Sequence, residues 1–128
     1  MNIIDTSLWI EYFSGRLVNQ LVKSVAEDKI NLIIPTICIY ELYKNSLVEH
    51  GETRAKTIVD IMQNGTTVIN LDEEIAKSAA VFSKEYKLPM ADSVIYATAK
   101  TYNAIVWTQD KHFEGLSSVK YFSKTKKD

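Results

Sequence analysis

Short apolar runs alternate with longer amphipathic stretches along the chain. The short runs predict β-strands at residues 2–4, 30–34, 66–69, 104–107 and 119–122. The run at 104–107 is apolar at every position, so we expect that strand to be buried on both faces. Between the runs, apolar residues recur every three or four positions. This spacing predicts helices that begin at Thr6 and near Asp72, and further helices over residues 16–27, 36–49, 52–63 and 90–102.

The regular alternation of strands and helices predicts an α/β fold. Such a chain builds a mostly parallel central sheet with helices on both faces. Helical spacing also predicts which side chains face the core: Leu17, Leu21 and Val25 in one helix, and Ile61 in the helix at 52–63. Asp72 is expected to cap the helix that follows it.

Composition limits the class of protein more than it identifies it. At 128 residues we expect one domain over residues 1–128, with residues 123–128 as a frayed polar tail. The longest purely apolar run is four residues, which excludes a transmembrane helix and a signal-peptide core. The single cysteine, Cys38, excludes an intrachain disulfide and fits a cytoplasmic protein. The net charge of −1 argues against a protein that coats nucleic acid through bulk positive charge.

Four acidic residues fall where the predicted fold brings them to one edge. Asp5 and Asp110 follow two predicted strands, Glu41 lies in the helix after the second strand, and Asp92 continues the apolar stripe of its helix. Ligands of open α/β sheets bind outside the carboxyl ends of the strands. Each acid also has a simpler interpretation: Asp5 and Asp92 as helix caps, Asp110 as a turn residue and Glu41 as a solvated side chain.

The joint placement of these acids favours a metal site. Carboxylates held close together raise one another's pKa unless a cation neutralises them. Clusters of oxygen ligands select hard divalent ions such as Mg²⁺ or Mn²⁺. An ion held in this way can activate water and stabilise displacement at phosphorus.

Four segments in order resemble the PIN-domain nucleases, and in particular the VapC toxins of toxin–antitoxin pairs. The segments are residues 4–13 (IDTSLWIEYF), 40–42 (YEL), 90–99 (MADSVIYATA) and 107–113 (WTQDKHF). The resemblance covers the chain from the first strand to the last. It implies a three-layer PIN-like fold with parallel strands in the order 3-2-1-4-5.

The resemblance also implies a site and a function. Asp5, Glu41, Asp92 and Asp110 would form the catalytic acidic site, in which Asp5, Asp92 and Asp110 hold Mg²⁺ or Mn²⁺. Thr6 and Thr108 would lie just behind these ligands. The implied activity is endoribonuclease cleavage of RNA phosphodiester bonds by a homodimeric toxin, which a small antitoxin protein blocks.

One position departs from the family pattern. Many relatives carry a further acid two residues after the fourth, where this chain has His112. We therefore expect one metal ion. His112 itself is open to two interpretations, as a residue that orients water or phosphate and as a surface turn histidine.

Other functions and roles remain open on the sequence. A housekeeping PIN nuclease without an antitoxin, a non-catalytic α/β binding domain and a phosphorylatable receiver-like domain are alternatives. The receiver is disfavoured because no Asp directly follows Ile34 at the second strand.

Basic residues near the motifs are either phosphate contacts or solvated charges: Arg16, Lys44 and Lys111. The first and third helices also carry more aromatic residues than one core needs, and we expect part of them to form a partner groove: Trp9, Tyr12, Phe13, Tyr40 and Tyr43.

Overall fold

The computed structural model describes residues 1–124 and places five strands in that range. They are β1 (Asn2–Ile4), β2 (Ile33–Pro35), β3 (Thr67–Ile69), β4 (Ile105–Thr108) and β5 (Val119–Tyr121). All five predicted strands are present. The second is shorter than predicted, because residues 29–31 form a 3₁₀ turn before it.

The strands are parallel and their order is the one that the family resemblance implied. β1 pairs with β4 and β4 with β5, while β2 pairs with β3. A single parallel bridge between Asn2 and Leu32 joins β1 to the chain entering β2. The order across the two sheets is therefore β3-β2-β1-β4-β5, with β1 in the middle.

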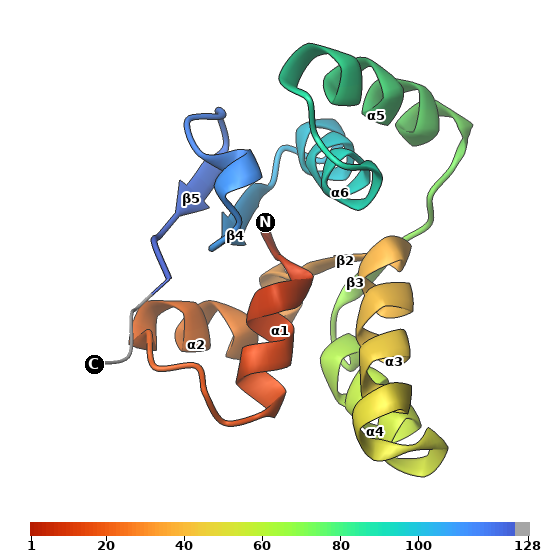
Figure 1. Ribbon diagram of the computed structural model, residues 1–128, viewed down its shortest axis with the longest axis vertical. Coiled ribbons are helices and arrows are strands. Elements are labelled where there is room, and N and C mark those ends of the chain that lie inside the picture. The colour runs from red at the N-terminus through yellow and green to blue at the C-terminus, as the bar shows by residue number, and fades with distance from the viewer. Residues whose placement is uncertain (125–128) are drawn as a thin grey trace.

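Six helices surround these strands in the described residues. They are α1 (Thr6–Phe13), α2 (Gln20–Glu27), α3 (Thr36–His50), α4 (Glu52–Gln63), α5 (Glu73–Tyr86) and α6 (Met90–Thr101). In Figure 1, α5 and α6 lie above the strands, and α1 and α2 lie below them. The prediction of a parallel α/β fold with helices on both faces is confirmed.

Capping residues explain where two of the helices begin. The Asp72 side chain accepts a hydrogen bond from the backbone N–H of Ile75 at 2.9 Å, which confirms the predicted cap of α5. The predicted start of the second helix at residue 16 is wrong. Asn19 caps α2 by accepting from the N–H groups of Leu21 and Val22, so residues 16–19 lie outside the helix.

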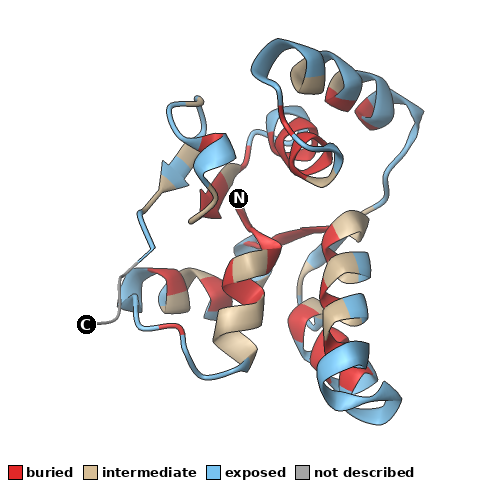
Figure 2. Ribbon diagram, viewed as in Figure 1, coloured by how far each residue is buried: buried red, intermediate tan, exposed pale blue. Residues whose placement is uncertain are grey.

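The core lies between the sheet and the helices that cover it. Buried residues concentrate in β1, β2 and β4, in α1 and along α6, whose residues 92–99 are all buried (Figure 2). Trp9 is buried in this core. Two predicted core residues are not: Leu21 is 59% exposed and Ile61 is 49% exposed. Leu21 turns outward because α2 begins later than predicted and uses Val22 and Ala26 to face the core.

The start of the predicted polar tail at residues 123–124 is exposed. The rest of that predicted tail, residues 125–128, lies outside the described residues. Among the helices in the described part of the chain, none is long and apolar enough to span a membrane.

Candidate active site

The four predicted acids meet at the carboxyl edge of the parallel strands. Asp5 directly follows β1, and Asp110 lies two residues beyond β4. Because β1 and β4 are parallel neighbours, their carboxyl ends lie side by side. Asp92 lies in the first turn of α6, and Glu41 lies in α3. All four line one pocket of about 530 Å³.

Four residues are here called the inner wall: Asp5, Thr6 and Glu41 line this pocket, and the buried Thr108 contacts Asp5. The Thr108 hydroxyl donates a 2.8 Å hydrogen bond to Oδ2 of Asp5, and the backbone N–H of Thr6 donates to Oδ1 at 2.8 Å. The Thr6 hydroxyl donates to Oε1 of Glu41 at 2.8 Å. Both threonines therefore lie directly behind the acids and fix their orientation.

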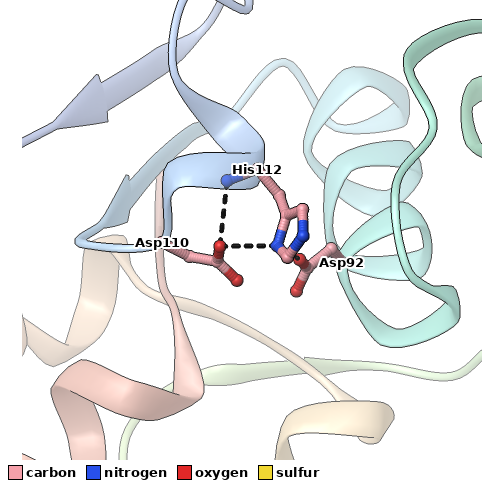
Figure 3. A group of neighbouring side chains, drawn as sticks. All are labelled: Asp92, Asp110 and His112. Atoms are coloured by element: carbon pink, nitrogen blue, oxygen red, sulfur yellow. Dashed lines mark hydrogen bonds and ion pairs between the residues drawn. The ribbon is translucent and has the colours of Figure 1, made fainter.

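A second group, here called the rim, consists of Asp92 and Asp110, which line the pocket, and His112, which lies beside them. Figure 3 shows Asp92 pointing from α6 toward Asp110 and His112. Nδ1 of His112 lies 2.7 Å from Oδ1 of Asp110 and 3.4 Å from Oδ2 of Asp92. Thr108 connects the two parts, because its hydroxyl oxygen also accepts a 2.9 Å hydrogen bond from the backbone N–H of Asp110.

Burial and mutual repulsion disfavour charge on two of the aspartates. Burial raises the pKa of Asp5 to about 6. The hydrogen bond from the Thr108 hydroxyl lowers this pKa by a smaller amount, and the Asp110 carboxylate raises it further. Burial, followed by the adjacent Asp110 carboxyl, raises the pKa of Asp92 to about 8. Asp110 behaves differently. Its partial burial acts to raise its pKa, but hydrogen bonds from the backbone of His112 and from Asp92 hold that pKa below its usual value.

The simpler interpretations of the four acids fare unequally. Asp5 does cap α1, and Asp110 caps the 3₁₀ turn at Lys111–Phe113 by accepting from the backbone N–H of His112. Asp92 does not cap α6, which Pro89 begins without a side-chain cap. Glu41 is half-buried and accepts from Thr6, so it is not simply a solvated side chain. Capping therefore explains where Asp5 and Asp110 lie. It does not explain why Asp92 and Glu41 line the same pocket.

The structure adds residues to the site that the sequence did not single out. His112 was considered from the motif spacing, but its contact with Asp92 depends on how α6 packs against the turn. The pocket is further lined by Ser7, Ile10, Asn45 and Val48, in addition to Tyr40 and Lys44, which the sequence had already indicated. A neighbouring pocket of about 600 Å³ shares Ser7 and Asp110 with it and includes Lys111 and Tyr121. The two pockets therefore meet at the acidic cluster.

The basic and aromatic residues considered from the sequence divide between two locations. Lys44 and Lys111 line the two pockets that meet at the acids. Arg16 lines other pockets, beside α2 and beside α4. Trp9 is buried, which is contrary to the expectation that it helps to form an exposed groove, whereas Tyr40 is 59% exposed beside the site.

The donor set fits a divalent cation. Asp92, Asp110 and His112 each offer one ligand atom, and these atoms all lie within 4.8 Å of one another. Asp5 lines the same pocket as the two other aspartates. Carboxylate oxygens are the preferred ligands of Mg²⁺ and Mn²⁺. A cation at this position would also offset the repulsion from Asp110 that adds to the effect of burial on the pKa of Asp92.

Comparisons with known proteins agree with this geometry. Residues 3–118 match the family model described as the PIN domain. Among solved structures, a chain of a toxin–antitoxin complex from Klebsiella pneumoniae has a TM-score of 0.75 at 26% identity, covering 93% of this chain and 95% of that one. A comparison with curated proteins gave no significant match.

Two more distant structures share the fold. A chain of the DNA-bound VapBC complex from Salmonella typhimurium has a TM-score of 0.77 at 16% identity, over 96% of this chain and 98% of that one. VapC20 of Mycobacterium tuberculosis, a toxin that cleaves the sarcin-ricin loop, has a TM-score of 0.72 at 14% identity, over 91% and 95% of the two chains. With the family model matching nearly the whole described chain, this protein belongs to the PIN domain family.

Proposed function

We propose that this protein is a metal-dependent endoribonuclease and the toxin of a toxin–antitoxin pair. Asp5, Asp92 and Asp110 would hold one Mg²⁺ or Mn²⁺ ion, and Glu41 would complete the cluster or position the attacking water. The observation that carries this proposal is the convergence of four carboxyl groups in one pocket at the carboxyl edge of the strands.

The chain's own residues suit hydrolysis of a phosphodiester. When bound, a divalent cation supplies positive charge that activates water and stabilises the charge developing at phosphorus. Thr6 holds Glu41 through a 2.8 Å hydrogen bond, which fixes one carboxylate oxygen and leaves the other for water. Thr108 and Thr6 together hold both oxygens of Asp5. The fixed orientation of these groups lowers the reorganisation that reaction requires.

The shape of the surface around the acids supports a strand of RNA as the substrate. The two pockets that meet at Asp110 together form a cleft across the site, with Lys44 in one half and Lys111 in the other. Each half also contains a tyrosine, Tyr40 or Tyr121. Lysines that contact phosphates and aromatic rings that stack on bases are the usual means of binding single-stranded nucleic acid.

The partner proposals rest on the relatives and on an exposed apolar surface beside the site. Several relatives of the same fold were solved within toxin–antitoxin complexes. On α3, Tyr40 and Val48 line the site pocket, and 59% and 78% of their surfaces are exposed. We propose that an antitoxin segment covers this surface, that the protein forms a homodimer in the cytoplasm, and that residues 1–128 form one nuclease domain.

Cleavage of a labelled single-stranded RNA by the purified protein tests the proposed activity. We expect cleavage with Mn²⁺ or Mg²⁺, loss of cleavage with EDTA and recovery when the ion is restored. Asp92→Asn should abolish cleavage. Asp60→Asn is the matched control, because Asp60 is exposed on α4, away from the site.

The same measurement can overturn the proposal. A folded Asp92→Asn protein that cleaves RNA at the wild-type rate would show that the acidic cluster is not the active site. Cleavage that persists in EDTA would show that no divalent ion is required. The toxin assignment is tested separately: expression of the chain alone should arrest growth, and coexpression with the antitoxin should restore it.

A further inference from the structure

His112 carries the one imidazole that lies beside the acids of the site within the described chain. Its Nδ1 atom lies 2.7 Å from Oδ1 of Asp110 and 3.4 Å from Oδ2 of Asp92 (Figure 3). The imidazole therefore faces both rim carboxyl groups, not solvent alone. Its side chain is 54% exposed, so an ion or water molecule can reach it from solvent.

The backbone around His112 fixes this position. Oδ1 of Asp110 accepts from the backbone N–H of His112 at 2.9 Å, so the two residues share one tight turn. The next residue, Phe113, is fully buried and anchors the turn in the core. His112 is therefore held beside Asp110 by the main chain, and its ring is not a freely moving surface group.

We propose that His112 is a nitrogen ligand of the divalent cation at this site, next to Asp92 and Asp110, and that it makes the site prefer first-row transition ions such as Mn²⁺ over Mg²⁺. This inference rests on the metal site of the proposed function. Mg²⁺ is bound almost entirely through oxygen, whereas imidazole is a good ligand for first-row transition ions. Replacing a family carboxylate by imidazole at this position changes the donor set in that direction.

The distances in the rim agree with a shared ion. Two neighbouring ligand atoms in the octahedral shell of an ion with bonds of about 2.1 Å are about 3 Å apart. The two separations from Nδ1 of His112, 2.7 and 3.4 Å, lie on either side of that value. Small rotations of the side chains are therefore enough to direct all three donor atoms at one point.

The competing explanation is that His112 only orients Asp110 through a hydrogen bond. That role would affect the affinities for Mn²⁺ and Mg²⁺ equally, because the ion would still meet the same oxygen ligands. A ligand role affects Mn²⁺ more than Mg²⁺. The ratio of the two affinities therefore separates the two roles.

Calorimetric titration of the metal-free full-length chain with Mn²⁺ and with Mg²⁺ measures this ratio. We expect His112→Ala to weaken Mn²⁺ binding by about 10–100-fold, as loss of a group in a metal site does, and to weaken Mg²⁺ binding much less. His112→Asp should restore oxygen ligation and shift the preference toward Mg²⁺. His50→Ala is the matched control, since His50 is the only other histidine and is exposed at the end of α3.

Electron spin-echo spectroscopy of the Mn²⁺-loaded protein gives a direct second readout. A nitrogen coupling should be present in the wild type and in His50→Ala and absent in His112→Ala. An unchanged ratio of Mn²⁺ to Mg²⁺ affinity in His112→Ala, or a nitrogen coupling that survives this substitution, would overturn the inference.

Failure of this inference can be distinguished from failure of the proposed function. If Mn²⁺ binding depends on Asp92 but not on His112, the metal site stands and the nitrogen ligand is rejected. If Mn²⁺ binds equally well to the wild type, Asp92→Asn and His112→Ala, the proposed metal site itself is rejected, and the inference falls with it.

Discussion

The inner wall and the rim of the candidate active site hold their aspartates in different ways. On the inner wall, Asp5 is 5% exposed, and its two oxygens accept hydrogen bonds from the hydroxyl of Thr108 and the backbone of Thr6. These partners belong to the ends of β4 and α1, which the core fixes. At the rim, Asp92 and Asp110 mainly contact each other and His112.

This difference separates a rigid part of the site from an adjustable part. The carboxyl oxygens of Asp5 on the inner wall already accept hydrogen bonds from the protein, so the geometry of the inner wall does not depend on an added ion. The rim brings two carboxyl groups together, and burial, followed by the adjacent Asp110 carboxyl, raises the pKa of Asp92. We infer that the rim is the part of the site whose stability responds to a cation, while the inner wall sets where that cation lies.

The largest expected effect is on catalysis, where the two parts should behave alike. We expect Asp5→Ala and Asp92→Ala each to reduce RNA cleavage by more than about 100-fold, since each removes a proposed metal ligand and loss of a group behind a ligand already costs about 10–100-fold. Initial rates on a labelled RNA measure this loss. A variant of either kind that retained a tenth of the activity would remove that residue from the catalytic set.

The same two variants should differ in stability. At about pH 5 both carboxyl groups carry a proton in the metal-free fold, so substitution tests their packing and hydrogen bonds. Asp5→Ala should lower the free energy of unfolding by about 0.5–2 kcal/mol, because it removes the cap of α1 and the acceptor for Thr108. Asp92→Ala should change it by less than about 0.5 kcal/mol, because Asp92 caps no helix. Equal losses in urea denaturation would contradict the division into two parts.

Thr108, which connects the two parts, should affect both stability and catalysis. We expect Thr108→Val to cost about 1–3 kcal/mol of unfolding free energy, because it deprives the buried Asp5 oxygen of a donor and the Asp110 N–H of an acceptor. Cleavage should also fall by about 10–100-fold. Thr57→Val is the control, because Thr57 is exposed on α4, and it should leave the free energy of unfolding nearly unchanged. If both variants unfold alike, Thr108 does not organise the inner wall.

Much of the fold could be predicted because its signals are local. Each of the five strands contains two or more apolar residues in a short run, and strand–helix alternation leaves few arrangements other than a parallel sheet. The errors arose where a polar residue competes with helical spacing. Helical spacing places Leu17, Leu21 and Val25 on one face of a helix. The helix begins only after its cap at Asn19, however, and Leu21 lies on the exposed side of it. Periodicity alone does not reveal that competition.

The site was partly predictable for a different reason. Asp5 and Asp110 lie near the ends of adjacent parallel strands, so topology alone brings them together. The contact of His112 with Asp92 was not predictable, because it depends on how α6 packs beside the turn at residues 111–113. Likewise, the burial of Trp9 depends on the shape of the core and not on its position in the first motif.

A further effect should appear in the pH dependence of the metal-free protein. Folding raises the pKa of Asp5 to about 6 and that of Asp92 to about 8, so between about pH 4 and 8 the folded chain binds more protons than the unfolded chain. The stabilisation is complete below about pH 4 and is lost as the pH rises through these values. The shift of Asp5 alone corresponds to a loss on the order of 1 kcal/mol between about pH 5 and 8.

Urea denaturation in EDTA at several pH values measures this loss. Asp92→Asn should reduce the pH dependence, because it removes one of the two groups. A saturating divalent ion should also reduce it in the wild type by stabilising the charged carboxylates. The lowered pKa of Asp110 acts at more acidic pH and does not change the expected direction. Stability that rises from about pH 5 to 8 without metal would contradict the proposed repulsion at the rim.

The smallest expected effect tests which hydroxyl holds the inner wall. Ser7 and Thr108 both donate to Oδ2 of Asp5, but the Ser7 contact is 3.3 Å long and partly exposed, whereas the Thr108 contact is 2.8 Å long and buried. Water can replace the Ser7 hydroxyl but not that of Thr108, so Ser7→Ala should cost less than about 0.5 kcal/mol. Chemical denaturation of Ser7→Ala, Thr108→Val and the double variant gives the comparison. Because the buried donor remains in Ser7→Ala, its metal affinity should stay at the wild-type value. If Ser7→Ala lowers the free energy of unfolding as much as Thr108→Val does, the Ser7 hydroxyl holds Asp5 as firmly as the buried Thr108 hydroxyl. Ser7 would then belong to the inner wall.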